Sequence, residues 1–141
     1  MKNEYWVHIK NVDNRLVIYL NGETLWDSGI VHDDPEINHF VEITDELKAH
    51  PTHTSELIFE GYNDTYKSDE ELNPWHFSYR LIKREIDDTG KVVSEEDIMK
   101  PYDEKHMSNP NIIAINNCYL IVCKNDEYKV VSYSLTQHFN N

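Results

Sequence analysis

Glycine and basic residues are scarce in this chain, and each scarcity argues against a class of protein. Four of the 141 residues are glycine, too few for the glycine-rich loops that hold phosphate groups. The Gly-x-Ser-x-Gly element of one large hydrolase class is absent as well. Thirteen Lys and Arg stand against 26 Asp and Glu, a net charge of −13. Because nucleic acids and anionic membrane surfaces attract positive charge, the sequence predicts binding to neither.

Long apolar runs are also missing, and cysteine is rare. The N-terminal residues lack the apolar stretch of a signal peptide, and no segment approaches the roughly 18 apolar residues of a membrane span. Cys118 and Cys123 lie five positions apart in one expected strand, which places them on opposite faces and too far apart for a disulfide. These features predict a cytoplasmic protein with reduced thiols.

The chain does have the length of one domain and a large supply of aromatic residues. With 141 residues, three Trp, nine Tyr and four Phe, it can bury a core without disulfides, so we expect one domain over residues 1–141. Its acids are unevenly placed, since residues 16–66 hold eleven acids and one Lys. Charge of that sign favours cations, neutral ligands or a basic protein as partners.

Alternation of apolar and polar residues predicts strands along most of the chain. Residues 1–27 are expected to form a three-stranded meander that includes an Asn21-Gly22 turn, the strongest short signal for a hairpin. A second hairpin is expected around Asn125-Asp126 near the C-terminus. The other strands of this prediction lie at residues 39–43, 55–62 and 75–82.

Short helical turns and loops are expected between these strands. Thr44 is positioned to cap one helical turn, and Ser94 resembles the start of a capping box whose helix Pro101 would stop. Residues 101–111 are expected to be irregular. About eight short strands without regular β-to-α alternation predict an all-β fold, either a two-sheet β-sandwich or a jelly roll.

The order of these features resembles the galactose-binding-like β-sandwich over about half of the chain. The resemblance rests on a strand that ends in an Asn-Gly turn (17–22), a strand that enters a helical turn through an Asp (40–47), and a hydrophobic strand that ends at an Asn (57–63). Within that group, residues 62–81 are similar to the loop of calcium-dependent galactose-binding lectins of bacteria, although the glycines common in such loops are absent. The resemblance implies carbohydrate binding, with Ca²⁺ as the candidate cofactor.

Two acidic loops supply the candidate site residues. Hard oxygen ligands such as those of the loop at 64–73 suit calcium, and neighbouring aromatic rings could stack on a sugar. The candidate metal ligands are Asp64, Asp69, Glu70 and Asn73. The candidate ligand-binding residues are Tyr62, Asn63, Tyr66, Asn73, Trp75, His32 and Asp33. The competing interpretation is that the acids are simply hydrated and that Trp75 belongs to the core.

The second loop, residues 27–39, contains residue types that suit zinc, manganese or acid–base chemistry. It lacks a His-Glu-x-x-His motif, a cysteine pair and any fixed ligand spacing, so no catalytic residue is assigned and we expect a protein that is not an enzyme. The sequence therefore favours a module that binds carbohydrate. The alternative is an acidic cytosolic protein-interaction domain, such as an inhibitor or immunity protein for a basic toxin.

Overall fold

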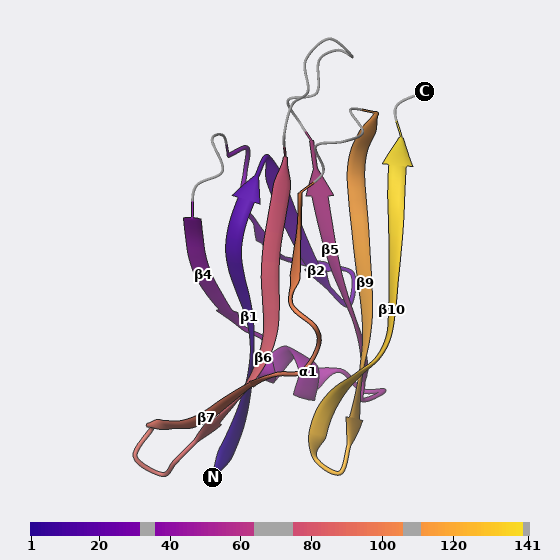
Figure 1. The fold of residues 1–141 in the computed structure, drawn as a ribbon. Helices are drawn as coiled ribbons and strands as arrows, with labels where there is room; N and C mark the ends of the chain where they lie inside the picture. Colours follow the sequence, from indigo (N-terminus) through magenta and orange to yellow (C-terminus); the bar gives the residue numbers. More distant parts are fainter. Residues whose placement is uncertain (32–35, 64–74, 106–110, 140–141) are drawn as a thin grey trace.

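The structure, a computed structural model, describes residues 1–31, 36–63, 75–105 and 111–139. These residues form two antiparallel sheets that pack face to face, with a short helix at one end (Figure 1). The all-β, two-sheet sandwich predicted from the alternation is thereby confirmed. The described residues contain ten strands rather than about eight.

The first sheet has the strand order β4-β1-β6-β7, and β8 also pairs with β6. All of its pairings are antiparallel. Its strands are β1 (Lys2–Asp13), β4 (Glu36–Glu42), β6 (His76–Ile86), β7 (Val92–Asp97) and β8 (Tyr102–Lys105).

The second sheet has the order β10-β9-β5-β2-β3, again antiparallel throughout. The helix α1 (Thr44–Ala49) connects β4 of the first sheet to β5 of the second. No helix in the described ranges is long and apolar enough to cross a membrane. The strands of the second sheet are β2 (Arg15–Leu20), β3 (Glu23–Asp27), β5 (Thr54–Tyr62), β9 (Ile112–Lys124) and β10 (Glu127–Phe139).

The core lies between the sheets and follows the period of two predicted from the sequence. Phe77, Tyr79 and Leu81 of β6 are buried, as are Leu57 and Phe59 of β5. The rings of Phe59 and Tyr79 stack across the core with their centroids 3.6 Å apart. Side chains at alternate positions point to one face of a strand, so the two sheets hold their large apolar groups against each other.

Both predicted hairpins are present. Asn21 and Gly22 have φ values of 52° and 83°, the positive values that a type I′ turn requires at both central positions. Asn125 and Asp126 also have positive φ, 53° and 62°. Asn and Asp tolerate this left-handed region better than other residues with a side chain, which explains why these pairs reverse the chain.

The predicted meander over residues 1–27 is wrong. Strand β1 pairs with β4 and β6, whereas β2 pairs with β3 and β5 in the other sheet. The chain therefore crosses between sheets near Asn14 instead of returning beside β1. Each sheet gains one strand with a buried apolar face, including Val7 and Ile9 from β1 and Leu16 and Ile18 from β2.

Two further local predictions are overridden by tertiary contacts. Residues 94–97 belong to strand β7 rather than a helix, because their backbone pairs with residues 82–85 of β6. Arg80 and Arg84 of β6 also bind the carboxylates of Glu95 and Asp97. Part of the expected loop at 101–111 is strand β8, in which Tyr102 stacks on Tyr79 at 5.2 Å.

The helix after β4 is present, but Thr44 does not cap it. Thr44 is the first helical residue, and its hydroxyl oxygen accepts a hydrogen bond of 2.8 Å from the backbone N–H of Tyr5. The same hydroxyl donates to Glu42. Thr44 thus links the helix to β1 and satisfies a buried backbone donor there.

Candidate functional site

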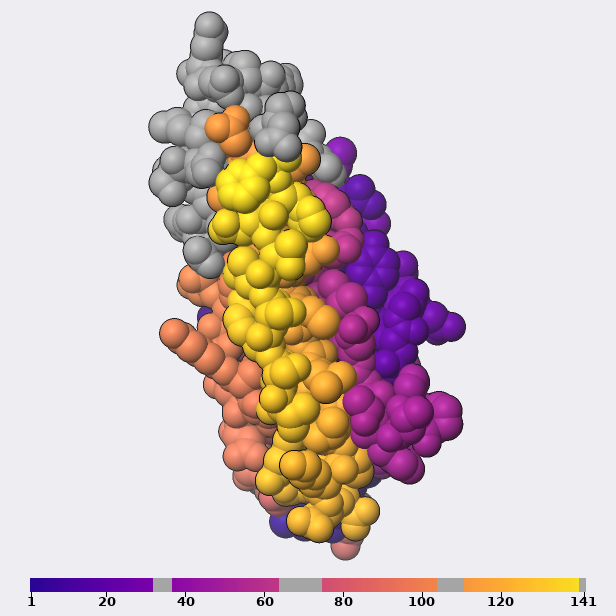
Figure 2. Space-filling model, turned by 90° about the vertical axis from the view of Figure 1, so that its right-hand side faces the viewer, coloured from indigo at the N-terminus to yellow at the C-terminus, as the bar shows by residue number. Residues whose placement is uncertain are grey.

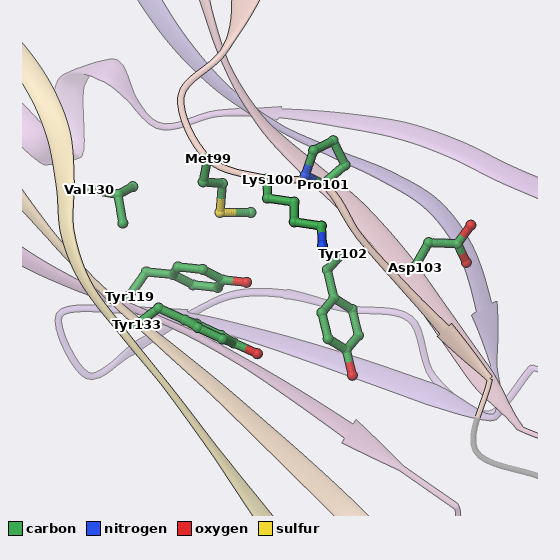
Figure 3. A pocket seen from close by; sticks show the side chains of 8 residues that line it. All are labelled: Met99, Lys100, Pro101, Tyr102, Asp103, Tyr119, Val130 and Tyr133. Carbon is green, nitrogen blue, oxygen red and sulfur yellow. The ribbon is translucent and has the colours of Figure 1, made fainter.

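A pocket of about 420 Å³ opens where the segment before β8 faces strands β9 and β10 of the other sheet. We call it the tyrosine pocket. Its volume lies within the range typical of sites for small ligands. Figure 3 shows the ends of Lys100, Tyr119 and Tyr133 turned toward the ring of Tyr102. The lining residues are Met99, Lys100, Pro101, Tyr102, Asp103, Tyr119, Val130 and Tyr133.

Two tyrosines from neighbouring strands form one wall of the pocket. Tyr119 of β9 and Tyr133 of β10 lie directly opposite each other in the strand register, and their ring centroids are 4.9 Å apart with the planes inclined by 25°. Tyr119 is buried, while half of Tyr133 (50%) remains exposed. The buried ring supports the exposed one, so Tyr133 presents a flat apolar surface at the pocket mouth.

A buried hydrogen-bond network fixes these rings in place. Asn117, which is 0% exposed, donates from Nδ2 to the Tyr79 hydroxyl at 2.8 Å. The Tyr133 hydroxyl donates to Asn117 Oδ1 at 3.0 Å. Because both the oxygen and the nitrogen of this amide form hydrogen bonds, Asn117 can adopt only one orientation. Its Oδ1 thereby fixes the position of the Tyr133 hydroxyl.

The same network includes a bond between the hydroxyls of Tyr79 and Tyr119, whose oxygens are 2.8 Å apart. Either hydroxyl can be the donor of this bond, because a hydroxyl oxygen can accept two hydrogen bonds and donate one. Tyr79 thus joins the amide of Asn117 to the hydroxyl of Tyr119, which lines the tyrosine pocket.

Tyr119 in the pocket wall, and Tyr79 behind it, are uncharged at neutral pH. Burial raises the pKa of Tyr119 to about 12, and burial also raises the pKa of Tyr79 well above its usual value. A phenol in a poorly hydrated site resists ionisation because its anion loses solvation. Charge enters only at the rim, where Lys100 and the exposed Asp103 provide one cation and one anion.

The predicted ligand-binding residues that the structure describes do not meet at one site. Tyr62 lies on the outer face of the second sheet, where its hydroxyl donates to Glu60 and its ring lies 5.7 Å from the guanidinium of Arg15. Burial and the Glu60 carboxylate raise its pKa. Asn63 is buried, and its backbone N–H donates to the Ile113 carbonyl at 2.9 Å.

Trp75 belongs to the core. It is 1% exposed and packs 6.2 Å from Phe77, so its ring face is not available for stacking on a sugar. The period-two pattern that begins at Trp75 is consistent with a core position. The prediction that Trp75 binds a ligand is therefore wrong.

The remaining predicted residues lie outside the described part of the chain. They are His32, Asp33, Asp64, Tyr66, Asp69, Glu70 and Asn73. Within the ranges that the structure describes, no three His, Cys, Asp or Glu side chains come together to hold a metal ion. The calcium site therefore stays a prediction.

Sequence reasoning missed the tyrosine pocket. Tyr119 and Tyr133 were assigned to the correct hairpin, but a regular two-residue turn at Asn125-Asp126 would pair Tyr119 with Ser132. A bulge between Val130 and Ser132 shifts the register by one residue and brings Tyr133 opposite Tyr119. The sequence signal for this site was the presence of several tyrosines in one hairpin. Such a count does not predict a bulge, so it could not predict which tyrosines would pair.

Comparisons with known proteins identify no family for this chain. No family model and no curated protein matches it. Among solved structures, the apo structure of Bacteroides uniformis beta-glucuronidase 3 aligns with 99% of this chain and 25% of its own length, at 9% identity and a TM-score of 0.29. The chain thus spans about a quarter of that protein's length.

Proposed function

We propose that this protein is a non-enzymatic module that binds carbohydrate in the tyrosine pocket. The observation that carries the proposal is the half-exposed ring of Tyr133, held flat against Tyr119 by the buried amide of Asn117. The apolar face of a sugar ring packs on an aromatic face of this kind, and a pre-oriented ring loses little conformational entropy when a ligand binds.

Polar groups around that ring suit the hydroxyls of a neutral ligand. Tyr119 and Tyr133 place hydroxyl-bearing side chains in the lining, and Lys100 and Asp103 at the rim add a donor and an acceptor. A small number of such groups within a mostly apolar lining is typical of small-molecule sites. The neutral tyrosine wall favours an uncharged sugar over an anionic one, because an anion would lose hydration there without a buried cation in compensation.

The proposal is tested by titrating the protein with a panel of neutral mono- and oligosaccharides in a calorimeter. We expect Tyr133→Ala to weaken binding of any hit about tenfold or more, the loss expected when an aromatic contact worth about 1.4 kcal/mol is removed. Tyr62→Ala is the matched control. It removes a tyrosine from the outer face of the second sheet, at the end of β5 and outside the tyrosine pocket. Melting temperatures establish that both variants are folded.

Three results would overturn the proposal. A panel without any hit would remove carbohydrate binding, and unchanged affinity in Tyr133→Ala would remove the tyrosine pocket as its site. Loss of binding in Tyr62→Ala but not in Tyr133→Ala would return the site to the loop near residue 62. Repeating each titration with calcium and then with EDTA tests the predicted cofactor, because a site built around Ca²⁺ loses its ligand when the ion is removed.

A basic protein remains the second candidate partner. The observation that favours it is the set of exposed acids on β3, β4 and α1. Lys48 is the single Lys or Arg among residues 16–66, so their negative charge is not balanced. Such a surface accelerates association with a cationic protein at low salt. Charge reversal at Asp45 and Glu46 would then slow association, whereas Tyr133→Ala would leave it unchanged.

A further inference from the structure

Strand β10 forms an edge of the second sheet, and it is the longest of the edge strands. It has 13 residues, against five in β3, seven in β4, six in β7 and four in β8, which pairs with β6. Among the described residues, no strand pairs with β10 on the side away from β9. Figure 1 shows β10 as the outermost strand of its sheet, and Figure 2 looks onto this edge, where its yellow atoms lie in front along much of the molecule.

Most of β10 is uncharged, unlike the other edge strands. Strands β3, β4 and β8 carry two acids each and β7 carries three. Strand β10 has Glu127 and Lys129 at its start, but no Asp, Glu, Lys, Arg or Pro occurs from Val130 to Phe139. Proteins protect exposed edges with charges and proline because an unprotected edge pairs with another strand. In a chain with a net charge of −13, the stretch from Val130 to Phe139 lacks the protection that the other edge strands have.

Apolar side chains gather on the same strand. Nine large hydrophobic residues are exposed among the described residues, and four of them, Val131, Tyr133, Leu135 and Phe139, belong to β10. Tyr133 lies opposite Tyr119 and Leu135 lies opposite Asn117 in the register. Residues opposite each other share a face of the sheet, so Tyr133 and Leu135 point to the inner side, at the margin of the core.

We propose that β10 pairs in antiparallel fashion with β10 of a second copy of this chain, about a twofold axis at Ser134. Residues 132–136 are palindromic in residue character about Ser134, whereas Val131 would meet Gln137 and Val130 would meet His138. An axis at Ser134 brings Tyr133 opposite Leu135 of the other copy and Ser132 opposite Thr136. Within residues 132–136, apolar residues then meet apolar residues and hydroxyls meet hydroxyls, which is the self-complementary pattern that a twofold interface requires.

A second copy also fits the electrostatics better than other occupants. Two molecules that each carry −13 repel each other, so they associate where neither brings an acid, and residues 128–139 contain none. A basic protein would instead be drawn to the acid-bearing edges at β3, β4 and β7. Pairing along one strand is small beside the roughly 1,600 Å² of a standard interface, so we expect a dimer that dissociates on dilution.

The pairing would join the two second sheets into one continuous sheet with both tyrosine pockets on the same side of it. Leu135 of the partner copy would then lie beside the exposed ring of Tyr133. This consequence rests on the proposed function: two carbohydrate sites held in one particle would bind a multivalent glycan more tightly than one site alone. The dimer itself does not depend on it.

Sedimentation velocity over a wide concentration series tests the proposal on the full chain. The wild type should shift from monomer to dimer mass as concentration rises. Ser134→Lys and Ser134→Asp each place two like charges on the twofold axis, so either variant alone should raise the dimer dissociation constant at least about tenfold. A mixture of the two variants pairs opposite charges and should restore the dimer. Ser94→Lys, on the exposed edge strand β7, is the matched control and should behave as wild type.

Hydrogen exchange of the β10 amides separates the remaining outcomes. The proposal requires that these amides become more protected as concentration rises. A wild type that stays monomeric with unprotected β10 amides would overturn the proposal, since the edge would then be open. A monomer whose β10 amides are protected at every concentration would also overturn it, because the chain would cover its own edge. A dimer that survives Ser134→Lys without change would place the interface elsewhere.

Discussion

The hydroxyl groups of Tyr79 and Tyr119, which come from opposite sheets, lie 2.8 Å apart inside the sandwich. Asn117 sits beneath them and donates to Tyr79. This contact connects the core to the tyrosine pocket, because Tyr79 stacks on Phe59 in the interior while Tyr119 stacks on Tyr133 at the surface. Changes to the network should therefore affect both stability and the shape of the pocket.

Replacing Asn117 with Ala should lower the free energy of unfolding by about 1–3 kcal/mol, because it removes the hydrogen-bond partner that the buried Tyr79 hydroxyl shares with the hydroxyl of the half-exposed Tyr133. Urea denaturation measures the loss. Asn116→Ala is the matched control: Asn116 is the neighbouring residue, on the opposite face of β9 and only half buried. Equal losses in the two variants would contradict the role assigned to the network.

Stability should decline in alkali as the buried tyrosines begin to ionise in the unfolded chain. The pKa of Tyr119 is raised to about 12 and that of Tyr79 is raised as well. Below a pH of about 10 both states are neutral and the stabilisation is fully present; above it the unfolded state loses protons that the folded state retains, so the free energy of unfolding falls until the folded pKa is reached.

The measurement for this prediction is urea denaturation at a series of pH values above and below 10, with Tyr119→Phe for comparison. The variant should show a shallower decline with pH, since one of the shifted groups is gone. Identical slopes in wild type and variant would show that Tyr119 titrates at its ordinary pKa. Absorbance titration of the phenols supplies an independent check on the same two proteins.

Gly61 is predicted to be intolerant of any side chain. A methyl group at this position would lie 2.6 Å from Cζ of Phe77 and closer still to its neighbours in the ring, so the ring or the strand would have to move. We expect Gly61→Ala to cost about 1–3 kcal/mol, the usual range for overpacking a core, as measured by the shift in the urea midpoint.

A double mutant separates this overlap from a general effect on strand β5. Phe77→Leu makes room, so Gly61→Ala should cost less in that background than in the wild type. Gly22→Ala serves as the second control: its surroundings are open but its φ is 83°, so we expect a backbone penalty of about 1 kcal/mol that Phe77→Leu does not relieve.

Arg84 is expected to contribute more to stability than its ion pair alone. Its guanidinium lies 5.2 Å from the ring of Trp6 and 5.0 Å from that of Phe40, and its Nε lies 2.9 Å from a Glu95 oxygen. We expect Arg84→Ala to cost about 1–3 kcal/mol, the sum of two exposed cation–π contacts and a surface pair. Glu95→Gln should cost less than about 1 kcal/mol.

Thermal denaturation in low and high salt distinguishes the two contributions. The Glu95→Gln effect should shrink in salt, because exposed ion pairs are screened. Most of the Arg84→Ala effect should remain, since close packing of a side chain against aromatic rings does not depend on ionic strength. Loss of both effects in high salt would reduce Arg84 to an ordinary surface charge.

Wherever the decisive information was local, the sequence alone was enough to predict the structure. Period-two alternation placed Phe77, Tyr79 and Leu81 on the buried face of β6, and Asn21-Gly22 and Asn125-Asp126 marked both hairpins because few residue pairs tolerate positive φ. The face on which a side chain lies and the position of a turn depend on neighbouring residues, so both can be predicted without knowing what lies across the core.

Sequence-based predictions failed where contacts between segments distant in the sequence determined the structure. Residues 94–97 have a helix-start pattern, yet they form a strand because their backbone pairs with residues 82–85 of β6. Which sheet a strand joins was also invisible, since β1 and β2 are adjacent in sequence but pair in different sheets. Partners of that kind are chosen by packing, which local alternation does not encode.

The tyrosine pocket depends on a bulge of one residue in the pairing of β9 and β10. The alternation established that Tyr119 and Tyr133 belong to one hairpin, with the side chains of each strand divided between two faces. A single extra residue between Val130 and Ser132 then moved Tyr133 to the face of Tyr119. Because side chains alternate with a period of two, a shift of one residue reverses every side chain beyond it, and only the folded pairing of β9 and β10 decides where that shift occurs.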